Sequence, residues 1–79
     1  MNKYLPHTLR IGRRLTIPVA DLADASSAYQ IARDDSGEGY STFPEGRVRM
    51  NGHLYTISYN GRVWDAPWTP NAKPILEAA

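Results

Sequence analysis

Few side chains in this sequence could act as a general base or a nucleophile. The chain of 79 residues has two histidines, His7 and His53, no cysteine and no G-x-S-x-G motif that would activate a serine. His53 opens a predicted strand beside a turn, where a partly exposed structural histidine is much commoner than a general base. We therefore expect no catalytic residues and a protein that is not an enzyme.

The one cluster of carboxylates consists of Asp34, Asp35 and Glu38. Three acids near a helix end could bind Mg²⁺ or Ca²⁺ through their oxygens. The D-D-S-G-E spacing does not match the twelve-residue EF-hand loop, however. A solvated acidic helix end is the simpler interpretation, so we expect no metal site and no cofactor.

Arginines could bind nucleic acid at two places in the chain. Arg10, Arg13 and Arg14 surround a predicted turn or bulge, and Arg47 and Arg49 fall on the polar side of a predicted strand. A sheet face or β-ribbon that carries arginines can contact phosphates or enter a groove. Nucleic-acid binding through these five residues is therefore one of two functional predictions.

Two features weigh against nucleic-acid binding. The predicted strand pairing places Tyr55, Tyr59 and Trp64 on the inner sheet face, which leaves no aromatic platform for stacking bases. The segment from residue 21 to residue 45 also contains six acids and one basic residue, Arg33, and its negative charge offsets the positive field of the arginines. The six acids are Asp21, Asp24, Asp34, Asp35, Glu38 and Glu45.

The leading prediction is a small protein-binding or accessory protein that acts through a sheet face or edge. A moderately apolar strand surface with arginines is typical of protein interfaces, and an open strand edge can pair with a partner strand. The partner is an unknown protein or a second copy of the chain, which would form a homodimer. The candidate contact residues are Arg47, Arg49, Leu54, Thr56, Val63 and Trp68.

A stretch from Gly46 to Asp65 must position most of these residues. It contains Asn-Gly at 51–52 and at 60–61, each between runs of β-branched and aromatic residues. Asn-Gly favours a two-residue type I′ hairpin turn, so we expect a three-stranded meander. Two such turns would give an inner face of Val48, Met50, Tyr55, Ile57 and Trp64, and an outer face of Arg47, Arg49, Leu54, Thr56, Ser58, Val63 and Asp65.

Upstream of the meander, the apolar residues between Thr8 and Ile17 all fall on odd positions, which is strand periodicity. Either one strand with a bulge at Gly12 or a hairpin with a three-residue loop fits this pattern. A helix should then run from about Leu22 to Ser36, with Asp21 as N-cap and Gly37 just past its end. Its buried stripe would consist of Leu22, Ala25, Ala28, Tyr29 and Ala32.

The expected fold is α+β, with two layers: one helix packed on a mostly antiparallel sheet. We expect a single domain over residues 1–66, with Tyr40 and Phe43 as anchors of the connector, and a Pro-rich tail over residues 67–79. A last helical turn could begin at Ile75. The net charge of +1 predicts no strong non-specific attraction to nucleic acid or membrane. Without a long apolar run or a signal-peptide pattern, we expect a cytoplasmic protein with no membrane partner.

Overall fold

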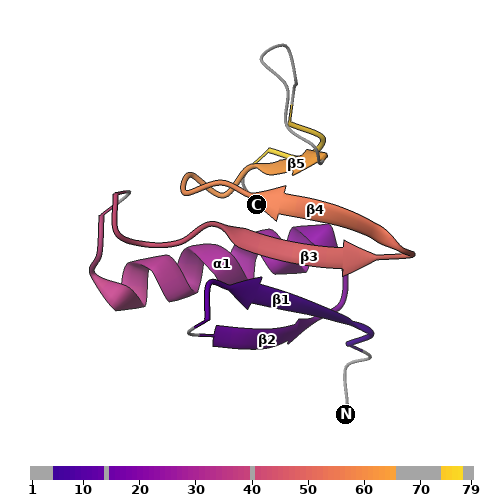
Figure 1. Cartoon of the computed structure of the whole chain (residues 1–79), viewed down its shortest axis with the longest axis horizontal. Coiled ribbons are helices and arrows are strands. Elements are labelled where there is room, and N and C mark those ends of the chain that lie inside the picture. Colours follow the sequence, from indigo (N-terminus) through magenta and orange to yellow (C-terminus); the bar gives the residue numbers. More distant parts are fainter. Residues whose placement is uncertain (1–4, 14, 40, 66–73, 78–79) are drawn as a thin grey trace.

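An antiparallel sheet of five strands forms the front layer of the protein in Figure 1. The computed structural model describes residues 5–13, 15–39, 41–65 and 74–77. The sheet order is β2-β1-β3-β4-β5, and helix α1 (Leu22–Ser36) lies behind the strands. The strands are β1 (His7–Ile11), β2 (Leu15–Val19), β3 (Gly46–Met50), β4 (His53–Ile57) and β5 (Val63–Asp65). The predicted α+β fold with two layers is confirmed.

Strands β1 and β2 form a hairpin with a three-residue loop, because Ile11 pairs with Leu15. Leu9 pairs with Ile17 in the same ladder, so the alternating apolar residues share the face that meets the helix, where Leu9 and Ile11 are fully buried. Of the two predicted arrangements, the hairpin is therefore correct. Strand β1 also pairs with β3, which joins the hairpin to the meander in one sheet.

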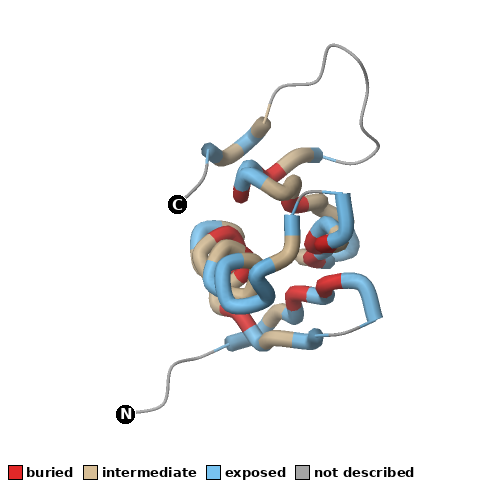
Figure 2. Tube along the Cα trace, turned by 90° about the vertical axis from the view of Figure 1, so that its left-hand side faces the viewer, coloured by how far each residue is buried: buried red, intermediate tan, exposed pale blue. Residues whose placement is uncertain are grey.

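Helix α1 has the bounds that the sequence predicts, and its caps explain why. The Asp21 carboxylate accepts a hydrogen bond from the Asp24 N–H at 2.8 Å, and the Asp24 carboxylate accepts one from the Ala20 N–H at 2.8 Å. At the other end the Gly37 N–H donates to the carbonyl of Asp34. Figure 2 shows that the helix covers only one side of the strands.

The core lies between the helix and the sheet and depends on close approach. Ala25 and Tyr29 of the helix are fully buried, and a Cβ added to Gly46 of β3 would lie 2.9 Å from the Tyr29 ring. The Tyr29 hydroxyl donates to the carbonyl of Pro44 at 2.8 Å, and burial raises the pKa of Tyr29 from 10 to about 12. Phe43 packs edge-on against Tyr29, as predicted, whereas Tyr40 lies outside the described residues.

The first predicted turn is correct and the second is not. Met50 pairs with His53 around a two-residue loop. In the second turn, however, Ile57 rather than Ser58 pairs with Val63. The Gly61 N–H donates to the Ser58 carbonyl, and the Ser58 N–H donates to the Arg62 carbonyl. The loop therefore holds three residues, 59–61, which is the type I turn with a glycine bulge.

This shift of one residue exchanges the faces of β5. Val63 is fully buried beside Ile57, while Trp64 pairs with Thr56 on the face away from the helix. The predictions of Val63 on the outer face and Trp64 on the inner face are therefore wrong. A change of register by one residue moves every side chain of a strand to the other face.

Contacts with the helix stabilise the three-residue loop. The Ser26 hydroxyl donates to the carbonyl of Gly61 at 2.6 Å, and Arg33 Nη1 donates to the carbonyl of Tyr59 at 2.7 Å. These are contacts between residues far apart in the sequence, so the pattern around Asn60-Gly61 alone does not contain them.

The described C-terminal residues 74–77 return to the sheet beyond β5. The Val63 N–H donates to the carbonyl of Leu76 at 2.9 Å, and the Ile75 N–H donates to the carbonyl of Val63 at 2.8 Å. The residues at 75–77 form an isolated bridge instead of the predicted helical turn. This bridge covers the outer edge of β5.

Candidate functional site

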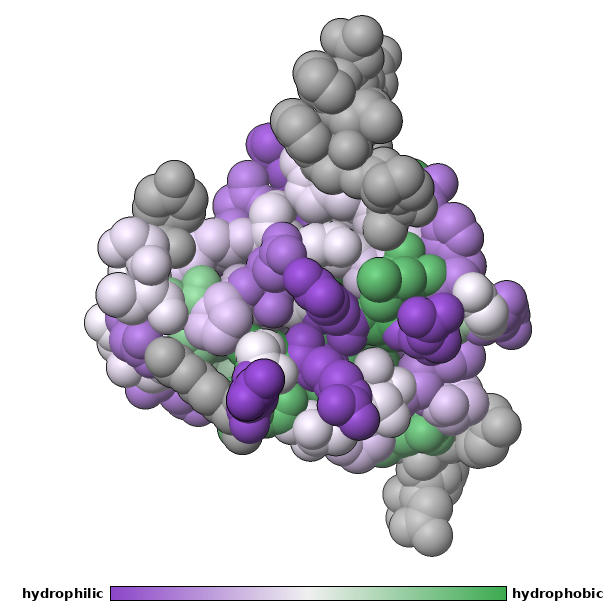
Figure 3. Space-filling model, in the orientation of Figure 1, coloured by the Kyte–Doolittle hydropathy of each residue, from purple (hydrophilic) through white to green (hydrophobic). Residues whose placement is uncertain are grey.

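Among the described residues, no helix or strand packs on the sheet face opposite the helix. We call it the open face. Figure 3 looks onto it and shows hydrophilic side chains crossing its middle beside a hydrophobic group. By the alternation and register of the strands, its members are Thr8, Arg10, Thr16, Pro18, Arg47, Arg49, Leu54, Thr56 and Trp64.

A single row of paired residues crosses the open face from one edge strand to the other. Arg10 pairs with Thr16 on one side and with Arg47 on the other. Arg47 then pairs with Thr56, and Thr56 with Trp64. We call these five residues the central row. Arg10 and Arg47 are therefore neighbours in this row, and Thr56 lies between Arg47 and Trp64.

The predicted arginine sites are brought together only in part. Arg10, Arg47 and Arg49 lie on the open face and are exposed, whereas Arg13 lies in the β1–β2 turn and Arg14 is outside the described residues. Arg49 donates to the carbonyl of Gly52 at 3.3 Å. Arg47 and Glu45 are 3.4 Å apart in an exposed ion pair, with side chains 62% and 52% exposed. Such a pair contributes little to stability.

Five of the six acidic residues between positions 21 and 45 belong to the helix layer. They lie on helix α1 and at its two ends, and they are Asp21, Asp24, Asp34, Asp35 and Glu38. The sheet lies between most of the protein's negative charge and the arginines of the open face. The positive charge on this face is therefore offset locally by Glu45 at its rim and less by the helix acids.

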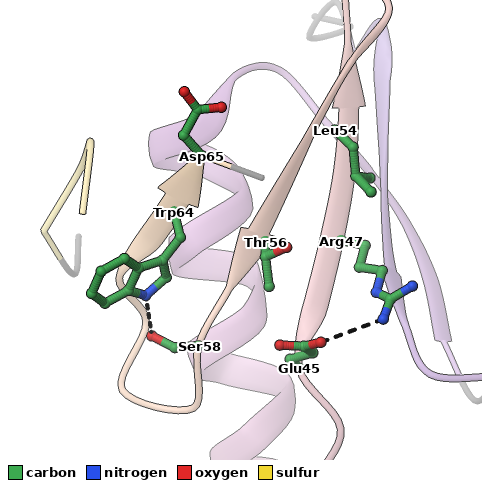
Figure 4. Close-up of a pocket in the computed structure, with 7 residues that line it drawn as sticks. All are labelled: Glu45, Arg47, Leu54, Thr56, Ser58, Trp64 and Asp65. Atoms are coloured by element: carbon green, nitrogen blue, oxygen red, sulfur yellow. Dashed lines mark hydrogen bonds and ion pairs between the residues drawn. The ribbon is translucent and has the colours of Figure 1, made fainter. Parts of the chain in front are cut away.

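An open hollow of about 490 Å³ lies over β4 and β5 (Figure 4). Leu54, Thr56 and Trp64 line it, and Arg47 and Glu45 stand at one side. The indole N–H of Trp64 donates to the Ser58 hydroxyl at 2.9 Å, which fixes the orientation of the half-buried ring.

A second hollow adjoins the first, over β1 and β3. It shares Arg47 and Leu54 with the first hollow and is also lined by Thr8, Arg10 and Arg49. Of the predicted protein-binding residues, Arg47, Arg49, Leu54 and Thr56 thus lie together. Val63 does not join them because it is buried, and Trp68 lies outside the described residues.

Sequence reasoning missed Trp64 as a surface residue because it assumed a two-residue second turn. Asn-Gly also fits the end of a three-residue loop, in which only the glycine has positive φ; Gly61 has φ 91 and Asn60 does not have positive φ. A three-residue loop places Val63 opposite Ile57, so that two apolar residues share the inner face. This apolar pairing was the signal in the sequence that favours the correct register.

His53 and Asp34 each bond to a neighbouring side chain in the structure. His53 Nε2 bonds to the Asp65 carboxylate, and both side chains are about half exposed, so water screens this pair. Asp34 pairs with Arg33 at 3.1 Å. Across the described ranges, no group of three or more His, Asp or Glu side chains is arranged to hold a metal ion.

Within the same part of the chain, no helix is both long and apolar enough to cross a membrane.

The two outer edges of the sheet, at β2 and β5, are protected against pairing with a further strand. Edge strand β2 contains Pro18, which has no N–H to donate to another strand. The outer edge of β5 already bonds to the segment at 75–76 through Val63. Pairing of a partner strand along either edge is therefore restricted.

Comparison with family models, with curated proteins and with solved structures finds no match for this chain.

Proposed function

We propose that this protein is a non-enzymatic binding module whose ligand occupies the open face. The supporting observation is that the helix covers only one side of the sheet, while the other side carries two adjoining hollows lined by arginines and a tryptophan. Aromatic residues and arginine are the types most enriched at binding surfaces. A sheet that needed only to be solvated would have no use for this combination.

The face is a better candidate than an edge. The protected edges argue against β-augmentation, since Pro18 and the bridge to Leu76 occupy the positions that a partner strand would use. The exposed side chains of the open face have no such restriction. Binding through a face also uses Arg47, Leu54 and Thr56 together, which lie on two adjacent strands.

The protein and nucleic-acid partners predicted from the sequence both fit this face in outline. Leu54 and Trp64 favour an apolar contact such as a protein surface provides, and the arginine pair Arg10 and Arg47 favours an anionic ligand. Homodimerisation through the open face would bring like charges together and is the least favoured of the three.

Site-specific crosslinking tests the proposal. The chain has no cysteine, so Thr56→Cys creates a unique attachment point for a photoreactive maleimide at the centre of the open face. Ala23→Cys on the exposed side of the helix is the matched control. After irradiation in a lysate of the host cell, we expect an adduct from position 56 that position 23 does not give.

Digestion of that adduct identifies the class of partner: a nuclease shortens a nucleic-acid adduct, whereas a protein adduct resists the nuclease and its partner is identified by peptide mass spectrometry. Equal labelling from both positions, or no adduct specific to position 56, would contradict a ligand on the open face.

A further inference from the structure

We propose that the ligand of the open face is single-stranded nucleic acid that lies along the central row, with its phosphates at Arg10 and Arg47 and a base stacked on Trp64. This proposal rests on the proposed function, because it names the ligand of the same face. It follows from two observations: the charge of the row and the position of its tryptophan.

The charge of the row calls for an anionic ligand. Arg10 and Arg47 are direct cross-strand partners, and like charges in that position repel each other. Arg49 is two residues from Arg47 on the same face, so three arginines lie on two adjacent strands. A phosphate backbone offers bidentate acceptors at regular intervals and relieves this repulsion.

The position of Trp64 favours nucleic acid over other polyanions. Strands in a sheet are about 4.8 Å apart, so Trp64 is roughly 10 Å from Arg47 and 14 Å from Arg10 along the row. One short length of backbone can therefore contact both arginines while a base from it reaches the indole. The hydroxyl of Thr56 lies between them and can bond to a phosphate or a base edge.

The ring of Trp64 also selects single strands over duplexes. Stacking on an aromatic side chain needs the flat face of a base, which a duplex hides between its neighbours. The hydrogen bond to Ser58 holds the indole in place, so it is positioned before a ligand arrives. Proteins that bind single strands combine such a platform with a positive groove along the backbone.

Two features of the sequence weigh against nucleic-acid binding, the inner position of the aromatic residues and the six acids, and the fold weakens both. Trp64 lies on the open face instead of the inner face, and five of the six acids lie in the helix layer. The sixth, Glu45, stands beside Arg47 in a long exposed ion pair. A bound phosphate would compete with this carboxylate, so Glu45→Gln should bind the ligand more tightly than the native protein.

The test measures fluorescence anisotropy of labelled 12-nucleotide single-stranded DNA and RNA, and of the matching duplex, at two salt concentrations. Native protein should prefer the single strands and lose affinity steeply as salt rises. Arg10→Gln and Arg47→Gln should each reduce the salt slope by about 0.7. Arg62→Gln is the matched control, since Arg62 follows the β4–β5 loop, lies outside the central row and pairs with Glu77 at 2.9 Å; its slope should stay native.

Two measurements isolate the stacking contact. Trp64→Leu should weaken binding roughly 5- to 150-fold, the range that loss of one stacked base gives. In case that variant does not fold, Trp68→Phe leaves Trp64 as the only tryptophan of the chain, and its fluorescence should be quenched when the oligonucleotide binds. Polyglutamate of matched charge serves as a competitor and should displace the oligonucleotide poorly.

Several results would overturn the proposal: no binding at low salt, equal binding of duplex, equal slopes for the control and the row variants, or efficient displacement by polyglutamate with Trp64 fluorescence unchanged. If oligonucleotides fail to bind while Thr56→Cys still captures a nuclease-resistant partner that Ala23→Cys does not, only the identity of the ligand is wrong. If position 56 captures nothing either, the proposed function fails with it.

Discussion

Arg10 and Arg47 face each other across β1 and β3, and this pairing costs stability in the free protein. Arg10→Thr removes the repulsion and introduces a residue with higher strand propensity. We expect the variant to be more stable than the native protein by about 0.2–1 kcal/mol, measured as the free energy of unfolding in urea. The same substitution should weaken ligand binding, because it removes one of the two arginines that we propose to contact phosphate.

Arg49→Thr is the matched control for this effect. It gains the same strand propensity on the same face, but Arg49 pairs with Leu54 and not with another arginine. A stabilisation of Arg49→Thr as large as that of Arg10→Thr would show that propensity, and not the paired charge, is responsible.

Tyr29 should make the protein sensitive to alkaline pH. Its hydroxyl is buried, and burial raises its pKa from 10 to about 12. Between these values the unfolded chain has lost a proton that the folded protein keeps, so stability is full below pH 10 and falls as pH rises toward 12. We expect this residue to account for a loss of about 2 kcal/mol over that range.

Chemical denaturation of the native protein and of Tyr29→Phe at pH 9 and pH 11.5 measures this loss. The variant lacks the ionisable group, so its deficit relative to the native protein should shrink at the higher pH. A deficit that is constant with pH would contradict the assignment.

At the scale of elements, the β4–β5 turn packs closely against helix α1. Gly61 has φ 91, and an added Cβ would lie 2.8 Å from the Gln30 side chain. Gly52, in the first turn, has φ 80 with open space around it. We expect Gly52→Ala to cost about 1–2 kcal/mol from backbone strain alone, and Gly61→Ala to cost measurably more in thermal or urea unfolding.

The excess cost should depend on Gln30. Gln30 Nε2 donates to the carbonyl and hydroxyl of Ser26, so it cannot move aside without losing hydrogen bonds. In a Gln30→Ala background, the penalty of Gly61→Ala should fall to that of Gly52→Ala. Additive penalties in this double-mutant cycle would mean that the turn does not press on the helix.

The same turn marks where the sequence was sufficient for prediction and where it was not. The helix bounds follow from local signals, namely the Asp21 cap, Gly37 and a stripe of alanines, and they are correct to the residue. The first turn follows from Asn51-Gly52, because both residues adopt the positive φ that the type I′ turn requires. The second Asn-Gly pair is locally compatible with two loops, and the choice is made by Ser26 and Arg33, more than 25 residues away. The candidate site was therefore only half predictable: its arginines were found, and its tryptophan was not.

At the scale of the whole molecule, the two layers carry different charge, and one side of the sheet has no element packed on it among the residues that the structure describes. Most acids belong to the helix and its ends, and the arginines Arg10, Arg47 and Arg49 belong to the open face. A ligand of negative charge would approach the open face in a preferred orientation. The outer strands do not favour lateral association into larger sheets.

Pro18 provides the last test, because it protects the edge strand β2. A proline on an edge strand leaves a gap in the row of N–H donors that another chain would need. Pro18→Val restores the donor with a residue that favours strands, so we expect stronger self-association in sedimentation velocity as protein concentration rises. Thr16→Val adds an apolar side chain to the same face of β2 without adding a donor, and should behave as the native protein does. If both variants associate equally, apolar surface and not the missing N–H controls assembly; if neither does, β2 is not the edge through which copies would pair.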